Sequence, residues 1–391
     1  MKLQFQYTAF FPSIGGVETY LDNVSRILSN LGHEPTILCS KHLPDLSDEE
    51  VYRGVKVIRH PSYYLSFPAS LIGPFYYVKK LQKFIKEKGI EADVILTRHP
   101  YYCYASCSES IAPVIYIPPS LKSLENKNSM IRRGVPAKLW GALRDLEIDF
   151  IEHKAVHGCD GIVVFSELMK CLIATYHRVP GKKIRVIPPG VDLQRFRPRK
   201  RDTSLLRELR IPKGSKIVLT VCRLSPLKRV DVLIDSFSKI REKNVHLIVV
   251  GDGRDRRYLE NLASNLHLGS RVRFVGFRRD VERFYSVADV FVLPSICESF
   301  GHVLLEAMSS GVPVIGFKRK HPNVLTACNE VIKNGETGYS IKFDVYELAA
   351  KINEIIGNEK LNEEMGRRAR ELCEKEYSWE KHVESLLDYI S

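Results

Sequence analysis

The stretch VFVLPSICESFGHVLLEAMSSGVPVIGF, residues 290–317, contains a strand, a helix and a second strand in direct succession. VFVLPS and VPVIGF are continuous apolar runs, which are typical of buried strands. Between them, GHVLLEAMSSG has apolar residues at helical spacing, and Gly311 stands where the helix would end. This strand–helix–strand order predicts a parallel β-sheet with helices packed on it.

The same alternation extends outward over two blocks of the chain. In the first block, strands are predicted at residues 3–11, 34–40, 55–60, 93–99, 113–118, 161–166 and 184–190. In the second block, they are predicted at 216–224, 245–253, 272–277, 290–295, 312–317 and 338–343. The sequence therefore predicts an α/β protein with two similar halves.

The segment GVDLQRFRPRKRD, residues 190–202, is rich in proline and arginine and suits a linker between the halves. A chain of 391 residues is also the right length for about two domains. We place the domains at 1–191 and 192–375. Residues 376–391 follow as a terminal helix with an apolar side.

Net charge, cysteine pattern and the lengths of the apolar runs limit the possible partners and location of the protein but do not identify its function. The formal net charge of +13 favours anionic partners, such as nucleotides or phosphorylated substrates. No recognised nucleic-acid module accompanies the basic residues, so we expect no nucleic acid partner. The nine cysteines are scattered and show neither a disulfide framework nor zinc spacing, which predicts a cytoplasmic protein without a metal. There is no signal peptide pattern and no apolar run that could cross a bilayer, so any membrane contact would be peripheral.

Ligands of parallel sheets bind beyond the carboxyl ends of the strands, which draws attention to the loops there. The first such loop, FFPSIGGVE, contains Gly15 and Gly16 just before a predicted helix at 17–31. Glycines let a phosphate approach backbone N–H groups, and the helix N-terminus adds partial positive charge. A glycine turn without any ligand is the alternative, because the spacing is not that of a dinucleotide fingerprint.

A second loop, in VCRLSPLKRVDVLIDSF, carries Arg223 and Lys228 between a strand and a helix. An arginine fork and a lysine at this place suit a diphosphate and would stabilise its charge as it departs. Solvated charges in an exposed loop are the alternative.

The third loop is the one in the opening stretch. Glu298 is expected in the strand–helix loop, and Glu306 about two turns into the helix, so that they would address different parts of one elongated ligand. The N–H groups of Phe300, Gly301 and His302 at the helix start offer further donors. The alternative is a helix-capping Glu298 with a solvent-facing Glu306.

Several motifs, taken together, resemble the retaining glycosyltransferase family 4 with the GT-B fold. They are GGVE, PPGVD, CRLSPLKRVDVLIDSF, VGDG, FVGF, LPSICESFGHVLLEAMSSGVPVIG and NGETGY. Their order and spacing cover nearly the whole chain, and the family's hallmark of two glutamates separated by seven residues is met by Glu298 and Glu306.

The resemblance implies two Rossmann-like domains that face each other across a cleft, with the last helix crossing back to the first domain. It implies transfer of a sugar from a nucleotide diphosphate sugar, with retention of configuration and without a metal or other cofactor. By this resemblance Arg223 and Lys228 grip the diphosphate and serve catalysis with Glu298.

The same resemblance assigns the remaining contacts with the donor. Gly15 and Gly16 help to hold the diphosphate, and Glu306 accepts from the ribose. Glu298 and the amides near Phe300, Gly301 and His302 hold the sugar, while Gly276, at the end of the strand VRFVGF, flanks the base.

The first half departs from the family at one position. Many members carry a histidine just after the strand PVIYIPPS, where this chain has Pro118, Pro119 and Ser120. His99, after the preceding predicted strand, is a candidate for contact with the sugar, although a lone histidine more often caps a helix or packs.

The acceptor is expected to be a glycan, a lipid-linked sugar or a small molecule. It would be shaped by residues 120–146, whose mixed apolar and basic character also suits a lipid-linked acceptor at a membrane face. The missing histidine leaves a non-catalytic binding protein as an alternative. A sugar epimerase is less favoured because no acid–base set is apparent, and a nicotinamide dehydrogenase because the glycine fingerprint is absent.

Overall fold

The computed structural model describes residues 1–13, 15–63, 73–89, 91–109, 111–121, 135–240 and 242–391. The chain divides into two compact units. The first comprises Met1–Pro188 together with His382–Ser391, and the second comprises Pro189–Lys381. Residues 122–134, which make up half of the segment expected to shape the acceptor site, lie outside the described residues.

The first unit is built on one eight-stranded sheet in the order β3-β4-β2-β1-β5-β6-β7-β8. Its strands are β1 Lys2–Gln6, β2 Glu34–Ser40, β3 Glu49–Tyr52, β4 Val55–His60, β5 Val94–Thr97, β6 Val114–Tyr116, β7 Gly161–Val164 and β8 Ile184–Val186. All neighbouring strands are parallel except β3, which runs antiparallel to β4. The sheet confirms the strands predicted for the first half.

Strand β3 was not expected from the sequence. It is a short edge strand, EEVY, with little apolar character. Its pairing depends on a two-residue turn at Arg53 and Gly54, whose φ angles are +50° and +84°. Positive φ at both central residues is the hairpin turn that matches strand twist.

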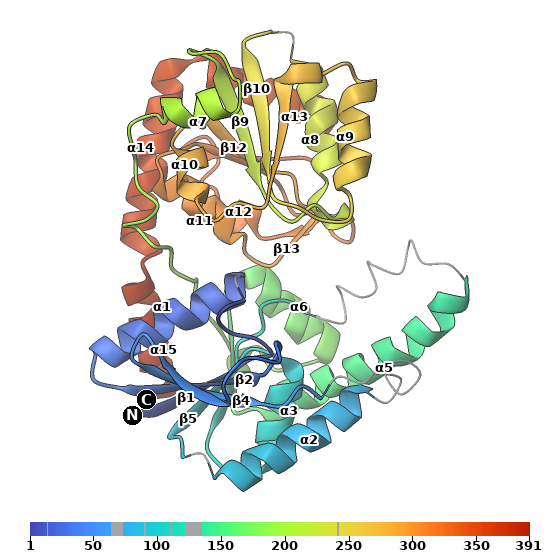
Figure 1. The fold of residues 1–391 in the computed structure, drawn as a ribbon, viewed down its shortest axis with the longest axis vertical. Coiled ribbons are helices and arrows are strands. Elements are labelled where there is room, and N and C mark those ends of the chain that lie inside the picture. The colour runs from blue at the N-terminus through green and yellow to red at the C-terminus, as the bar shows by residue number, and fades with distance from the viewer. Residues whose placement is uncertain (14, 64–72, 90, 110, 122–134, 241) are drawn as a thin grey trace. The chain divides into compact units, whose positions relative to one another are not determined.

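The helices of the first unit cover both faces of this sheet (Figure 1). They are α1 Gly16–Asn30, α2 Gly73–Lys88, α3 Pro100–Glu109, α5 Val135–Gly158, α6 Glu167–His177 and the 3₁₀ turn η3 Gly181–Lys183. Helices α2, α3 and α5 share one apolar cluster with β2 and β4. The chain goes from β1 outward to β2 and β4, then returns to place β5 on the other side of β1, so the crevice between β1 and β5 is the topological switch point.

The second unit has a six-stranded parallel sheet in the order β11-β10-β9-β12-β14-β16. Its strands are β9 Lys216–Val221, β10 Val245–Val250, β11 Val272–Gly276, β12 Val290–Leu293, β14 Val314–Phe317 and β16 Gly338–Ile341. Two further short strands, β13 Cys297–Glu298 and β15 Leu325–Thr326, pair with each other. Glu298 therefore lies in a two-residue strand rather than in an irregular loop.

Helices also cover both faces of the second sheet. They are α7 Thr203–Glu208, η4 Pro226–Lys228, α8 Val230–Ser238, α9 Arg256–Asn265, η5 Gly269–Arg271, α10 Val281–Tyr285, α11 His302–Ser309, α12 Cys328–Val331, α13 Val345–Gly357 and α14 Glu359–Glu376. Residues of α8, α9 and α13 form one apolar core with the sheet, and Figure 1 shows α10, α11 and α14 on its other side. Both units are thus Rossmann-like α/β domains, as the sequence predicted.

The terminal helix α15 spans Trp379–Ile390, and from His382 onward it groups with the first unit. Val383 and Leu386 are fully buried. The His382 ring accepts or donates on both sides, with Nδ1 2.7 Å from the carbonyl oxygen of Pro188 and Nε2 3.0 Å from the hydroxyl of Tyr20. This buried ring fixes the end of the chain against α1.

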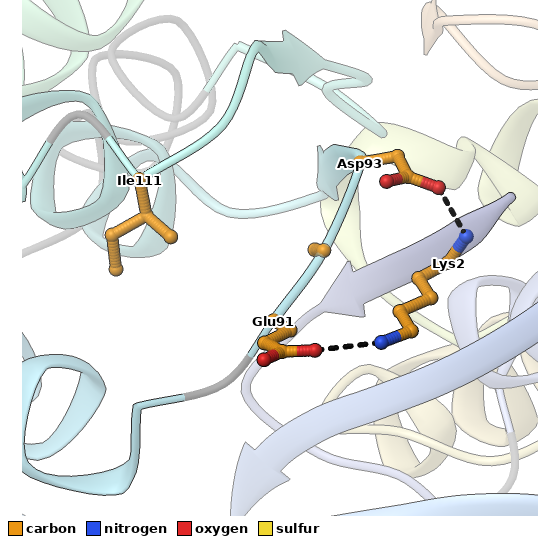
Figure 2. Close-up of a pocket in the computed structure, with 5 residues that line it drawn as sticks. Lys2, Glu91, Asp93 and Ile111 are labelled. Atoms are coloured by element: carbon orange, nitrogen blue, oxygen red, sulfur yellow. Dashed lines mark hydrogen bonds and ion pairs between the residues drawn. The ribbon is translucent and has the colours of Figure 1, made fainter.

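A surface hollow of about 370 Å³ lies at the amino-terminal ends of β1 and β5, lined by Lys2, Glu91, Ala92, Asp93 and Ile111 (Figure 2). Lys2 donates from Nζ to Glu91 and from its backbone N–H to Asp93, at 2.6 and 2.7 Å. The charged side chains that line the hollow thus have partners within it. The hollow lies at the edge of the sheet opposite to the one at which parallel sheets bind ligands. Among the described helices, none combines the length and the apolar character needed to cross a bilayer.

Burial lowers the pKa of His382 to about 4, because the imidazolium would lose its hydration in this site. A histidine whose pKa is lower in the folded state than in the unfolded state makes its full contribution to the stability of the fold at pH values above its unfolded pKa. This contribution is lost as the pH falls from about 6.5 towards 4. We predict that His382→Gln is less stable than the wild type at neutral pH but loses about 2 kcal/mol less on going from about pH 7 to pH 5. Urea unfolding at the two pH values measures this difference.

The control is His267→Asn, which replaces an exposed histidine and should leave the pH dependence unchanged. Equal losses of stability in the wild type and in His382→Gln would show that His382 does not titrate on unfolding.

Candidate functional site

The predicted charged residues of the second unit lie in the segments that follow two neighbouring strands. Strand β9 leads into the loop that carries Arg223 and Lys228, and β12 leads into the segment that carries Glu298 and Glu306. Val290 and Phe291 of β12 pair with β9 in parallel register. Since the carboxyl ends of adjacent parallel strands lie at the same edge, the fold brings these two segments together.

Lys228 and Glu298 form an ion pair at this edge. The ammonium Nζ donates to Glu298 Oε2 at 2.5 Å, and the two side chains are only 22% and 16% exposed. Leu227 fixes the lysine's turn, because its carbonyl oxygen accepts from the N–H of Ile296 at 3.0 Å. Although burial works against the charge, the Glu298 carboxylate raises the pKa of Lys228. The ammonium is thus charged and held in place before any ligand arrives.

Arg223 lies next to this pair in sequence but is exposed. Its flanking residues are fixed by hydrogen bonds from Cys222 N–H to Val250 and from Leu224 N–H to Asp252, at 3.0 and 2.9 Å. The two glycines of the motif VGDG, residues 250–253, let the two backbone segments come close enough for these hydrogen bonds. A Cβ on Gly251 would lie 1.9 Å from the Cys222 carbonyl oxygen, and one on Gly253 2.2 Å from that of Leu224, so only glycine fits.

Glu306 lies four residues after the first residue of α11, His302, and therefore about one turn into the helix, not two. The hydroxyl of Tyr285 donates to Glu306 Oε2 at 2.8 Å. Burial raises the pKa of Glu306 to about 7, and Tyr285 opposes this rise by donating to the carboxylate. Glu306 is therefore not the solvent-facing residue of the alternative interpretation, and it exchanges a proton near neutral pH.

Tyr285 itself was not identified from the sequence. It ends α10, an element of five residues, and lies 21 positions before Glu306. No local spacing connects the two residues. Only the packing of α10 against α11 brings the hydroxyl to the carboxylate.

At the start of α11, Gly301 lets the backbone pass close to neighbouring side chains. Gly301 has a φ of +92°, and a Cβ there would lie 3.1 Å from the side chains of Leu293 and Leu304. Phe300 is buried and the ring of His302 stacks on Trp379, with 6.5 Å between ring centroids. On the neighbouring β10–β11 edge, the carbonyl oxygen of Gly276 accepts from Gly251 N–H at 2.8 Å. These close contacts hold the backbone near the edge that carries the charged pair.

The remaining predicted residues belong to the first unit. Gly15 and Gly16 lie at the start of α1, where Gly15 is half-buried and Gly16 exposed. His99 follows β5, and its Nδ1 accepts from the N–H of Tyr101 at 3.3 Å in the first turn of α3. Through this contact His99 caps the amino-terminal end of α3. Pro118, Pro119 and Ser120 follow β6 at the same edge.

Comparisons with known proteins cover both units. The family model Glycosyltransferase Family 4 matches residues 14–195, and the model Glycosyl transferases group 1 matches residues 202–372. N-acetyl-alpha-D-glucosaminyl L-malate synthase of Bacillus anthracis is 28% identical over 396 residues, covering 98% of this chain and 95% of that protein. The likeness thus extends over nearly the full length of that relative.

Two solved structures share the fold. Sucrose-phosphate synthase from Thermosynechococcus elongatus superposes with a TM-score of 0.82 at 22% identity, covering 99% of this chain and 98% of that one. Anabaena Alr3699/HepE in complex with UDP-glucose superposes with a TM-score of 0.78 at 19% identity, covering 100% and 99%. At these identities the superpositions show the common fold.

The raised pKa of Glu306 predicts a stability that changes with pH. An acid whose pKa is higher in the folded state costs nothing when protonated in both states, and it destabilises the fold as the pH rises from about 4.5 through 7. We therefore expect Glu306→Gln, which can still accept from Tyr285, to remove a loss of about 2 kcal/mol between about pH 5 and pH 8. Chemical unfolding at the two pH values measures it.

Glu336→Gln replaces an exposed glutamate of the same unit and serves as the control. If the wild type and Glu306→Gln lose equal stability over this range, the buried carboxyl group does not titrate as described.

Proposed function

Because the chain belongs to the GT-B glycosyltransferases of family 4, we propose that it moves a sugar from a nucleotide diphosphate sugar to an acceptor hydroxyl, with retention of the anomeric configuration and without a metal. The observation that carries the proposal is the set of charged groups gathered at one edge of the second sheet. There a partly buried ion pair, an exposed arginine and a glutamate whose pKa is raised to about 7 follow two adjacent strands.

The diphosphate is the part of the donor that this edge suits best. Arg223 presents an unburied guanidinium fork, and Lys228 presents an ammonium that is already positioned. Both would neutralise the charge that grows on the departing diphosphate, which is the role a metal ion has in other transferases. When the diphosphate takes over Lys228, the Glu298 carboxylate is released to accept from hydroxyls of the sugar.

The ribose is assigned to Glu306. As a carboxylate it can accept from two neighbouring hydroxyls, and Tyr285 holds it in one orientation. The amides near Phe300, Gly301 and His302 would complete the sugar contact, and Gly276 would flank the base. Gly15, Gly16 and His99 belong to the first unit, and their contacts with the donor are proposed from the family resemblance alone.

The proposed reaction takes place on one face of the sugar. The bond between the anomeric carbon and the diphosphate oxygen breaks, and the acceptor oxygen bonds to the same carbon from the same side. The acceptor proton passes to an oxygen of the departing diphosphate. No protein base is needed for this step, because the leaving group itself accepts the proton.

The proposal also covers the chemical class of the acceptor. The names of relatives include L-malate and D-inositol 3-phosphate, which are small molecules, as well as a diacylglycerol. We propose a small-molecule, glycan or lipid-linked acceptor, a cytoplasmic location in view of nine free cysteines, and at most a peripheral contact with a membrane.

Alanine substitution tests the proposed donor site. Removing a charge-assisted hydrogen bond costs about 1.5–3 kcal/mol, so we expect Arg223→Ala, Lys228→Ala and Glu306→Ala each to weaken donor binding about tenfold or more. Calorimetric titration with a panel of nucleotide sugars measures the binding. Release of nucleoside diphosphate in the presence of mixed acceptors measures the turnover.

The control is Lys243→Ala, which removes an exposed positive charge at the amino-terminal end of β10, away from the loops in question. Unchanged binding in all three site variants would refute the donor site. Binding without any release of nucleoside diphosphate would instead favour the non-catalytic alternative.

A further inference from the structure

Three histidines of the first unit gather where α5 and α6 end. His153 and His157 lie in the last two turns of α5, and His177 is the last residue of α6. The ring centroid of His153 lies 4.3 Å from that of His157 and 5.9 Å from that of His177. None of the three residues belongs to the segments assigned to the donor, so their clustering requires an explanation of its own.

The spacing of His153 and His157 places them side by side on one face of the helix. Residues four positions apart on an α-helix are neighbours on its surface. Two histidines at this spacing can bind one transition metal ion, because both imidazoles reach the same point. Both side chains are exposed, so an ion can reach them from the solvent.

The distance between the two rings also suits a shared ion. Two imidazoles that bind an ion at about 2.1 Å, at a right angle to each other, have ring centres roughly 4.5 Å apart. The observed separation is 4.3 Å, and the ring planes are inclined by 50° instead of lying face to face. Right angles between ligands are typical of the square-planar and tetragonal sites of Cu²⁺ and Ni²⁺.

A hydrogen bond determines which nitrogen of His157 is able to bind a metal. Its Nε2 lies 2.9 Å from the carbonyl oxygen of His177. Because a carbonyl oxygen only accepts, Nε2 carries the proton, and in the neutral ring Nδ1 keeps its lone pair. Histidines that bind metals usually have such a partner on their second nitrogen. The carbonyl of His177 therefore orients the ring of His157 before any ion arrives.

The ring of His153 is kept in the form that binds metals. Desolvation lowers the pKa of His153, and the nearby His157, His177 and Lys154 lower it further. The ring is therefore neutral at neutral pH, and only a neutral imidazole binds a metal ion.

The surrounding charges limit the kind of ion. Lys154 follows His153 in the sequence, and Lys183 donates from Nζ to the carbonyl oxygen of His157 at 2.8 Å. The carboxylate of Glu152 is buried and faces His177 Nε2 at 3.7 Å. Among the described residues no three histidine, cysteine or acidic side chains already form a metal site. The ion must therefore bond strongly to two imidazoles, which Mg²⁺ and Ca²⁺ do not.

We propose that His153 and His157 form a binding site for a divalent transition metal ion such as Ni²⁺ or Cu²⁺. Nδ1 of His157 and one ring nitrogen of His153 bind the ion, and water occupies its remaining positions. The ion would hold the last turns of α5 together. It is no part of the proposed sugar transfer, so the site does not depend on the proposed function.

The test titrates the full chain with NiCl₂ at neutral pH by calorimetry, using protein made without a histidine tag and treated with EDTA. We expect one Ni²⁺ to bind. His153→Gln and His157→Gln should each raise the Kd about tenfold or more, because each leaves a single imidazole. Ni²⁺ should also raise the Tm of the wild type more than that of either variant.

Two control variants separate this site from other ligands. His267→Asn removes an exposed histidine of the second unit, and Cys171→Ser removes an exposed thiol of α6. Both should bind Ni²⁺ as the wild type does. The proposal is overturned if His153→Gln and His157→Gln keep the affinity of the wild type. It is also overturned if either control variant loses as much affinity as they do.

A second measurement needs no variant and decides the matter if a variant does not fold. The electron paramagnetic resonance spectrum of the wild type with one equivalent of Cu²⁺ should show coupling of the copper electron to imidazole nitrogens. A spectrum without nitrogen coupling would contradict the proposed ligands.

Discussion

The parallel pairing of β9 with β12 is the constraint on which the account of this protein depends. It makes two loops that are about seventy residues apart in the chain leave the sheet at one edge, and it lets Lys228 donate to Glu298. The pair is partly buried, so each group would be costly to leave without its partner. In the proposed function, an incoming diphosphate would offer Lys228 a new anion, and the hydroxyls of the sugar would offer Glu298 new donors in exchange.

The second unit keeps its charges paired at the edge where a ligand is expected. There Lys228 and Glu298 satisfy each other. In the proposed function, the diphosphate of the donor would take the place of the carboxylate. Binding would then create no new unpaired charge, since it replaces one partner with another, and this keeps the cost of desolvation low.

Much of the fold follows from the sequence because buried parallel strands are continuous apolar runs. Thirteen strands were predicted, and each overlaps an observed strand in the right order. The strands that escaped prediction, β3, β13 and β15, are short, and pairing with a neighbour rather than apolar character defines them. Gly301, just before α11, adopts a left-handed conformation that no apolar pattern reveals.

The same distinction holds for the candidate site. Arg223, Lys228, Glu298 and Glu306 lie in the segments that follow two apolar strands, where a local pattern can find them. The contact of Tyr285 with Glu306, by contrast, joins two helices that are distant in the sequence. The central claim is tested most directly by a crystal structure of the full chain with UDP bound. The account predicts that Lys228 Nζ leaves Glu298 for an oxygen of the diphosphate and that Glu306 accepts from the ribose, whereas a nucleotide bound elsewhere, with the Lys228–Glu298 pair intact, would contradict it.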